Sequence, residues 1–119
     1  MGDMKLGTVE THFAEIVWAN EPITTSQLVK ICAEELLWKR TTTYTVLKKL
    51  SEKGIFRTEN SVVTSVISKK EFDAMQSEQF VEENFRGSLP AFLAAFGSRK
   101  KLSDKEIEEM KQLIEQMRR

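Results

Sequence analysis

A run of threonines followed by two lysines is the most chemically suggestive segment of this 119-residue chain. Four of the five residues from 41 to 45 are threonine, and Lys48 and Lys49 follow within about one helical turn. Threonine hydroxyls can donate to or accept from base edges, and the threonine methyl can contact the methyl group of thymine. Lysine and arginine side chains bind phosphates without reading sequence. This combination of residues suits recognition of double-stranded DNA in the major groove.

The spacing of these residues predicts a helix with two different faces, running from about residue 40 to 53. One face repeats at i, i+3, i+4 and i+7, as expected for the side packed on a core: Thr43, Val46, Leu47 and Leu50. The opposite face carries the candidate base contacts Thr41, Thr42 and Thr45. β-Branched residues lower helix stability, so a helix facing only solvent would seldom carry so many threonines. Gly54 is expected to end the helix in the left-handed conformation.

Basic residues are concentrated around this helix, although the whole chain is neutral, with 18 Lys and Arg against 18 Asp and Glu. Between residues 38 and 57, six basic residues are opposed by the single acidic residue Glu52. Phosphate attraction is screened over about 8–10 Å, so a local cluster matters more than the total charge. A solvated helix face is the alternative explanation. The candidate phosphate contacts are Lys39, Arg40, Lys48, Lys49 and Arg57.

Three helices and a hairpin are predicted to position these side chains. The first helix is predicted over residues 10–19 with Gly7 as its N-cap, and the second runs from Thr24 to about residue 35. Segments 55–59 and 62–66 are rich in β-branched and aromatic residues and are separated by a two-residue turn, so they predict a β-hairpin. The predicted fold is therefore mainly α, with residues 1–68 forming a winged helix-turn-helix DNA-binding domain.

The remaining residues, 69–119, are predicted to form a helical dimerisation domain. Capping boxes at residues 68–71 and 103–106 open two of its helices, and Ser88 caps a third. The small residues at 95–98 are expected to join two helices. Apolar side chains on these helices would be exposed in a monomer, and a twofold interface would cover them; packing back onto the winged helix is the alternative. The candidate dimer contacts are Phe80, Phe85, Leu89, Phe92, Phe96, Ile107, Met110, Leu113, Ile114 and Met117.

Cysteine and histidine content argues against catalysis, metal binding and cofactors. Cys32 and His12 are the only residues of their types, so neither an internal disulfide nor a zinc site of ordinary ligand count can form. Both lie in segments with a helical apolar pattern, which favours structural roles over a nucleophile–base pair. The chain has no apolar run near the roughly 20 residues that span a bilayer. Residues 1–7 lack signal-peptide features, so we expect a cytoplasmic protein without membrane insertion.

Four segments together resemble the BlaI/MecI-type penicillinase repressors. Segment 6–18, with the pattern LxxxExxFxxIVW, is similar to the opening helix of that family. Segment 38–54, WKRTTTYTVLKKLxxKG, is similar to its recognition helix. Segments 86–89, RGSL, and 102–107, LSxxEI, resemble its C-terminal dimerisation helices. The resemblance covers nearly the whole chain in the right order.

The resemblance implies a homodimeric repressor of a resistance or stress operon, bound to a palindromic operator through Thr41, Thr42 and Thr45. In the penicillinase branch, a membrane zinc metalloprotease sensor triggers cleavage at a position that matches Ala95-Phe96. Here Ala95 replaces the asparagine common at that cut. The hairpin is shorter than the usual wing, which leaves Arg57 as its expected DNA contact. The copper-sensing branch has clustered cysteines, so Cys32 alone excludes that role.

Two other classes of protein are weighed against a repressor. A winged helix can serve as an adaptor that binds another protein, and a salt titration with DNA distinguishes this class because phosphate binding weakens with salt. An enzyme has little support, since the sequence shows no glycine-rich phosphate loop, metal set or nucleophile–base motif. For a repressor, the sequence favours induction by disruption of the dimer over binding of a ligand in the winged helix.

Overall fold

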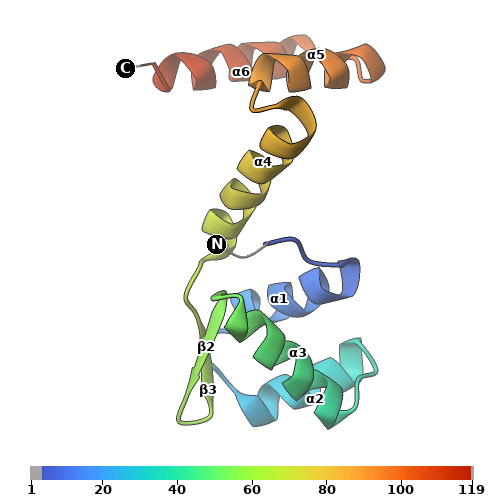
Figure 1. Ribbon diagram of the computed structural model, residues 1–119, viewed down its shortest axis with the longest axis vertical. Coiled ribbons are helices and arrows are strands. Elements are labelled where there is room, and N and C mark those ends of the chain that lie inside the picture. Colours follow the sequence, from blue (N-terminus) through green and yellow to red (C-terminus); the bar gives the residue numbers. More distant parts are fainter. Residues whose placement is uncertain (1–3, 119) are drawn as a thin grey trace. The chain divides into compact units, whose positions relative to one another are not determined.

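The computed structural model describes residues 4–118 and has the predicted mainly α fold, a winged helix followed by a helical region (Figure 1). The chain divides into two compact units, residues 1–77 and 78–119, and the boundary lies within helix α4. The functional division at residue 68 stays a prediction. The elements are α1 (Thr8–Asn20), β1 (Ile23–Thr24), α2 (Thr25–Glu35), α3 (Arg40–Glu52), β2 (Phe56–Glu59), β3 (Val62–Ser65), α4 (Lys69–Phe85), α5 (Leu89–Arg99) and α6 (Asp104–Gln116).

The helices of the first unit begin and end where short polar motifs satisfy their free backbone groups. The Gly7 N–H donates to Glu10 Oε1 at 3.1 Å, and α1 starts at Thr8, slightly earlier than predicted. At the start of α2, the Gln27 N–H donates to Thr24 Oγ1 at 3.1 Å, which confirms that Thr24 is the N-cap. Gly54 follows α3 with a φ of 82°, the left-handed conformation that a helix end favours.

The wing is the predicted hairpin, and it belongs to a larger sheet than the sequence indicated. Asn60 and Ser61 connect β2 and β3 with φ values of 52° and 62°, as a two-residue type I′ turn requires. The predicted two-stranded hairpin is present, and β1, which was not predicted, pairs antiparallel with β3 to give the strand order β1-β3-β2. With only two residues, β1 has no alternating pattern of its own, so its pairing depends on the distant β3.

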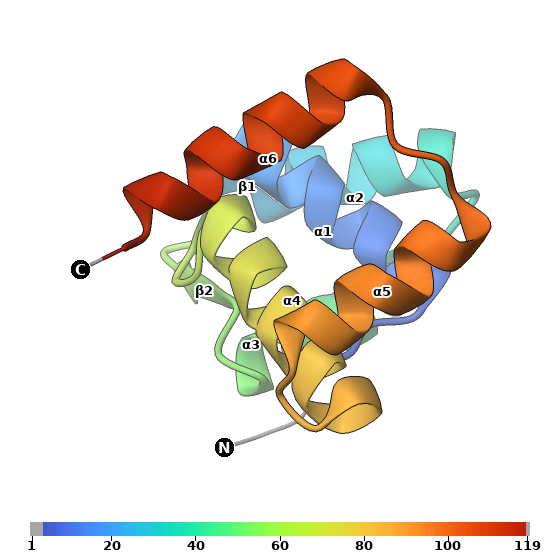
Figure 2. The same cartoon turned by 90° about the horizontal axis from the view of Figure 1, so that it is seen from above.

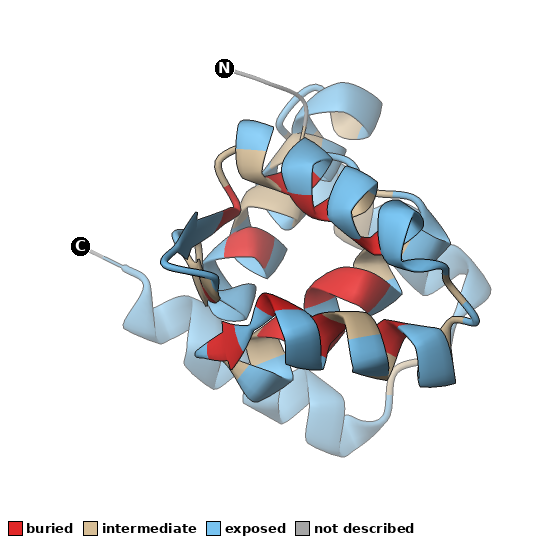
Figure 3. Ribbon diagram, turned by 90° about the horizontal axis from the view of Figure 1, so that it is seen from below, coloured by how far each residue is buried: buried red, intermediate tan, exposed pale blue. Residues whose placement is uncertain are grey.

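The core of the first unit lies between the inner faces of its helices and the sheet, where Figure 3 shows the buried residues in red. Trp18 is partly buried and packs against this core, with its ring centroid 5.5 Å from that of Phe56 and 5.4 Å from that of Phe72. Its Nε1–H donates to the Ile67 carbonyl at 3.0 Å, which satisfies the indole while its ring is packed. Phe72 lies on α4, so the beginning of that helix is part of the winged-helix core.

The second unit consists of helical segments with little to cover them. Ser88 and Ser103 cap α5 and α6 as predicted, by accepting from the backbone N–H groups of Ala91 and Glu106 at 3.1 Å. After the loop at residues 100–103, α6 runs back in roughly the opposite direction to α5 (Figure 2). No residue described between positions 78 and 118 is buried. This unit therefore lacks a core of its own.

One prediction for this region was wrong. Residues 95–98 do not join two helices, because they lie inside α5, which continues to Arg99. The Ser98 hydroxyl donates to the Ala95 carbonyl at 2.7 Å, an interaction with the preceding helical turn. Alanine is the best helix former, and a glycine inside a helix costs only about 1 kcal/mol, so small residues here did not indicate a break.

Candidate nucleic-acid interface

Helix α3 has the two faces that its sequence predicts. Thr43, Leu47 and Leu50 are buried, and Val46 is partly buried against the core. The other face is exposed and carries the candidate DNA contacts Thr41, Thr42, Thr45, Lys48 and Lys49. Packing of β2 against α3 places the wing beside this helix (Figure 1). The core thus fixes α3 through one face and leaves the threonine and lysine face free to meet a partner.

The three exposed threonines differ in what their hydroxyls can offer. Thr45 Oγ1 donates to the Thr41 carbonyl at 2.8 Å, so its proton is used within the helix. This leaves the Thr45 methyl group and the oxygen lone pairs for a partner. The hydroxyls of Thr41 and Thr42 make no hydrogen bond with residues 4–118, so each remains free to donate or accept. Thr41 and Thr42 are therefore the more versatile candidates for base contacts.

Arg40 is held at the beginning of α3 by Tyr44, one helical turn later. The guanidinium carbon lies 5.3 Å from the centroid of the Tyr44 ring, and Nη2 lies 3.5 Å from the phenol oxygen. Stacking on an aromatic ring limits the motion of a guanidinium and leaves its N–H fork available for a phosphate or a base. Tyr44 was not among the predicted contact residues, although its i, i+4 spacing from Arg40 was a usable signal.

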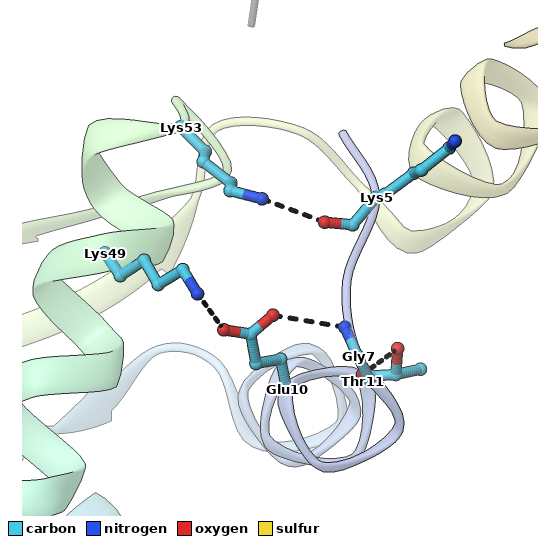
Figure 4. Close-up of polar contacts among 6 residues, drawn as sticks. All are labelled: Lys5, Gly7, Glu10, Thr11, Lys49 and Lys53. Carbon is cyan, nitrogen blue, oxygen red and sulfur yellow. Dashed lines mark hydrogen bonds and ion pairs between the residues drawn. The ribbon is translucent and has the colours of Figure 1, made fainter. Parts of the chain in front are cut away.

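Lys49 is engaged with the first helix, and sequence reasoning did not detect this contact (Figure 4). Its Nζ forms an ion pair with Glu10 Oε2, while Glu10 Oε1 accepts from the Gly7 N–H. The hydrogen bond from Lys49, assisted by that from Gly7, holds the pKa of the Glu10 carboxyl below its ordinary value despite partial burial. Lys53 Nζ likewise donates to the Lys5 carbonyl at 2.8 Å. Segment 5–10 therefore binds Lys49 in the last turn of α3 and Lys53, the C-cap residue that follows it.

The other predicted phosphate contacts are more exposed to solvent. Within the part of the chain that the structure describes, the side chains of Lys39 and Lys48 form no ion pair or hydrogen bond. On the wing, Arg57 Nε lies 3.4 Å from Glu59 Oε1, and both side chains are largely exposed. An ion pair between exposed side chains contributes only about 0–1 kcal/mol, so Arg57 can exchange it for a phosphate at little cost.

Cys32 and His12 occupy structural positions. Cys32 is fully buried, and burial raises the pKa of its thiol, although the neighbouring Thr43 hydroxyl partly opposes this. A buried, protonated thiol is a poor nucleophile. His12 is exposed, with Nε2 lying 3.7 Å from Glu35 Oε1. Residues 4–118 contain no group of three His, Cys, Asp or Glu side chains able to hold a metal ion.

The predicted dimer contacts all lie in the second unit. Phe80 and Phe85 of α4 meet Phe92 of α5, with ring centroids 5.6–6.1 Å apart, and Phe96 lies 6.0 Å from Phe92. Phe80 and Phe96 remain 49% and 43% exposed even within this aromatic cluster. The apolar stripe of α6 is also largely uncovered: Ile107, Leu113, Ile114 and Met117 are exposed and Met110 is partly buried. Leu89, at the start of α5, is 57% exposed.

Comparisons with known proteins agree with this arrangement. The family model described as Penicillinase repressor matches residues 6–116. A curated relative named penicillinase repressor, from Bacillus licheniformis, is 23% identical over 116 residues, which cover 94% of this chain and 91% of the relative. No helix in residues 4–118 is long and apolar enough to span a bilayer. With a winged helix whose third helix presents threonines and lysines, this chain belongs to the penicillinase repressor family of transcriptional repressors.

Proposed function

We propose that this protein represses transcription by binding a palindromic operator as a homodimer, with α3 in the major groove. The observation that carries the proposal is the exposed face of α3, where three threonines stand beside Lys48. Thr41, Thr42 and Thr45 would contact base edges, because their short hydroxyl and methyl groups match what the major groove presents. Such a helix is held at the correct depth by cations that bind phosphates on either side.

Four cations are suited to contact phosphates directly: Lys39, Arg40, Lys48 and Arg57. They are exposed, and none is held by a buried partner. Lys49 is a fifth candidate, but it would have to exchange the Glu10 carboxylate for a phosphate oxygen. Phosphate contacts contribute affinity without sequence information, so these residues would set overall DNA affinity, whereas the threonines would set the preferred site.

The second unit supports dimerisation. A folded unit normally buries apolar side chains, yet residues 78–118 contain none that is buried. Exposed phenylalanines on α4 and α5 and the stripe on α6 would be covered by the same surface of a second copy. Two linked winged helices would bind two half-sites of an operator at once, and this raises affinity through effective concentration.

Because tight operator binding would depend on the dimer, disruption of the dimer would relieve repression. The relative is named for repression of a penicillinase, and we propose that this chain controls a comparable resistance operon. Cleavage by a membrane sensor protease at Ala95-Phe96 would separate α6 from the rest of the protein. Both residues are exposed but helical, so a protease would have to unwind the end of α5 before cutting.

The proposal is tested by selecting duplexes from a random-sequence pool with the full-length protein. We expect enrichment of a twofold-symmetric site whose half-sites lie about one or two helical turns apart. Affinity for the selected duplex should fall linearly with salt on a double logarithmic plot, and sedimentation should show a dimer at micromolar concentration. No enrichment, together with salt-independent behaviour, would instead indicate a winged-helix adaptor that binds protein.

A further inference from the structure

Among the described residues, Glu10 provides the only carboxylate that forms an ion pair with a cation of α3. The other cations of this helix, Arg40 and Lys48, are exposed and have no acidic partner among the described residues, and Arg40 stacks on Tyr44. Glu10 lies 39 positions before Lys49 in the chain, at the beginning of α1. The exposed side of α3 carries Arg40, Lys48 and Lys49, and its single acidic residue, Glu52, ends the helix. Figure 4 shows Glu10 from α1 facing Lys49 of this basic face.

The two partners of this ion pair are held very differently. The Glu10 side chain is 21% exposed and is fixed by the Gly7 N–H at the helix N-cap. The Lys49 side chain is 55% exposed and has no other partner in the described part of the chain. The carboxylate is therefore the fixed member of the pair, and the flexible lysine can move to another anion. A DNA phosphate is the anion that would approach this helix in the proposed function.

We infer that Glu10 takes the place of a DNA phosphate on Lys49, and so limits the part of DNA affinity that does not depend on sequence. This inference rests on the proposed function. When DNA binds, Lys49 stays on Glu10, so in the wild-type protein it adds no phosphate contact. Holding back one cation lowers affinity for random DNA and for the operator alike, and it leaves the threonine contacts unchanged. A smaller share of the total binding free energy is then independent of sequence.

The test measures binding of full-length protein to a random-sequence duplex over a range of salt concentrations. Glu10→Gln removes the negative charge but keeps an oxygen for the Gly7 N–H, because glutamine also serves at this position of a capping box. Glu71→Gln is the matched control. Glu71 accepts from the Ser68 N–H at the same position of the α4 capping box, so this variant changes net charge and helix start equally.

We expect Glu10→Gln to bind random DNA about two- to fivefold more tightly than wild type at low salt, as for release of one exposed ion pair. One more phosphate contact steepens the slope of log affinity against log salt by about 0.9. Glu71→Gln should not steepen the slope. Lys49→Ala should leave the wild-type slope nearly unchanged, but should remove the added slope in the Glu10→Gln background.

Two results would overturn the inference. If Glu10→Gln and Lys49→Ala both weaken binding to random DNA, Glu10 directs Lys49 toward DNA rather than away from it. If Lys49→Ala lowers the slope by about 0.9 in the wild-type background, Lys49 already binds a phosphate. The second result does not depend on the folding of the Glu10 variant. Failure of the proposed function would give a different result, because the wild-type protein itself would then bind neither the selected nor the random duplex.

Discussion

At the scale of single residues, side chains of one type acquire different roles in α3. Thr43 is buried beside Cys32, whereas Thr41, Thr42 and Thr45 are exposed. Among the exposed three, only Thr45 uses its proton in a bond to the preceding turn. The lysines differ in the same way, since Lys48 has no partner among residues 4–118 and Lys49 is paired with Glu10. Position on the helix, more than residue type, determines what each can contribute to DNA recognition.

This distinction predicts opposite behaviour for Thr42→Ala and Lys48→Ala. Loss of the Thr42 hydroxyl should cost about 1–3 kcal/mol on the selected operator and much less on random DNA, because base contacts discriminate between sequences. Lys48→Ala should weaken binding to both duplexes about equally and lower the salt slope by about 1. Fluorescence anisotropy with both duplexes at several salt concentrations measures these effects.

Thr64→Ala provides a control for general effects of losing a threonine, because Thr64 lies on the wing strand β3 rather than on α3. It should change neither binding constant appreciably. Equal losses on operator and random DNA for Thr42→Ala would show that this threonine does not read sequence.

At the scale of elements, the turn between α2 and α3 sets the position of the recognition helix. Leu37 adopts a φ of 57°, which is rare for a branched side chain, and it is 86% exposed. The backbone N–H of the next residue, Trp38, donates to the Cys32 carbonyl at 3.2 Å. The Trp38 ring stacks on that of Phe13, with the ring centroids 5.7 Å apart. Packing of Trp38 therefore keeps Leu37 in an unfavourable conformation.

Leu37→Gly should stabilise the protein, because glycine adopts positive φ without the left-handed penalty of about 1–2 kcal/mol. The greater freedom of glycine in the unfolded chain offsets about 0.5–1 kcal/mol of this gain. We expect a net increase of up to about 1.5 kcal/mol in the free energy of unfolding, measured by urea denaturation.

Leu36→Gly is the matched control, since Leu36 has a φ of −113° and is packed against the core. It should destabilise the protein through lost burial and added chain entropy. Equal destabilisation by the two substitutions would show that the Leu37 conformation carries no strain.

At the scale of the whole molecule, the two units depend on different sources of stability. The first unit has a core built from all three of its helices and the sheet, including Phe72 at the start of α4. The second has helix caps and an aromatic cluster but no buried residue in the range 78–118. Caps contribute about 1 kcal/mol each, too little to order three helices without tertiary packing. In our proposal, a second copy of the chain supplies that packing.

A fragment ending at residue 95 should lose dimerisation and tight operator binding. It lacks Phe96 and the whole of α6, and each lost buried apolar side chain costs about 1.5–3 kcal/mol of the proposed interface. Operator affinity should fall by orders of magnitude while the winged helix remains folded. Sedimentation and operator titration of the fragment and the full chain measure both effects.

A second fragment, ending at residue 101, separates the two contributions because it keeps α5 complete and removes only α6. It should also be impaired if the α6 stripe is part of the interface. A 1–95 fragment that dimerises and binds as the full chain does would contradict induction by cleavage, and a ligand or protein partner would then be the better explanation.

The sequence by itself determined the features that neighbouring residues encode. Thr24 with Gln27 and Ser103 with Glu106 predicted helix starts, and Asn60-Ser61 predicted the hairpin turn. The alternation of buried and exposed residues on α3 was equally readable, because it depends on spacing within one helix. Resemblance over four segments was sufficient to indicate the family, which the comparisons confirm.

Only the tertiary structure decided the contacts between distant parts of the chain. The strand at Ile23–Thr24 exists because β3 pairs with it, and no local pattern marks two residues as a strand. The Trp18 indole meets the Ile67 carbonyl 49 positions away, and Glu10 meets Lys49 across 39. Such pairs form when packing of the core brings their elements together. A single sequence does not show which distant charged residues will come into contact. The same reason explains why Lys49 looked like a free phosphate contact until α1 was placed beside α3.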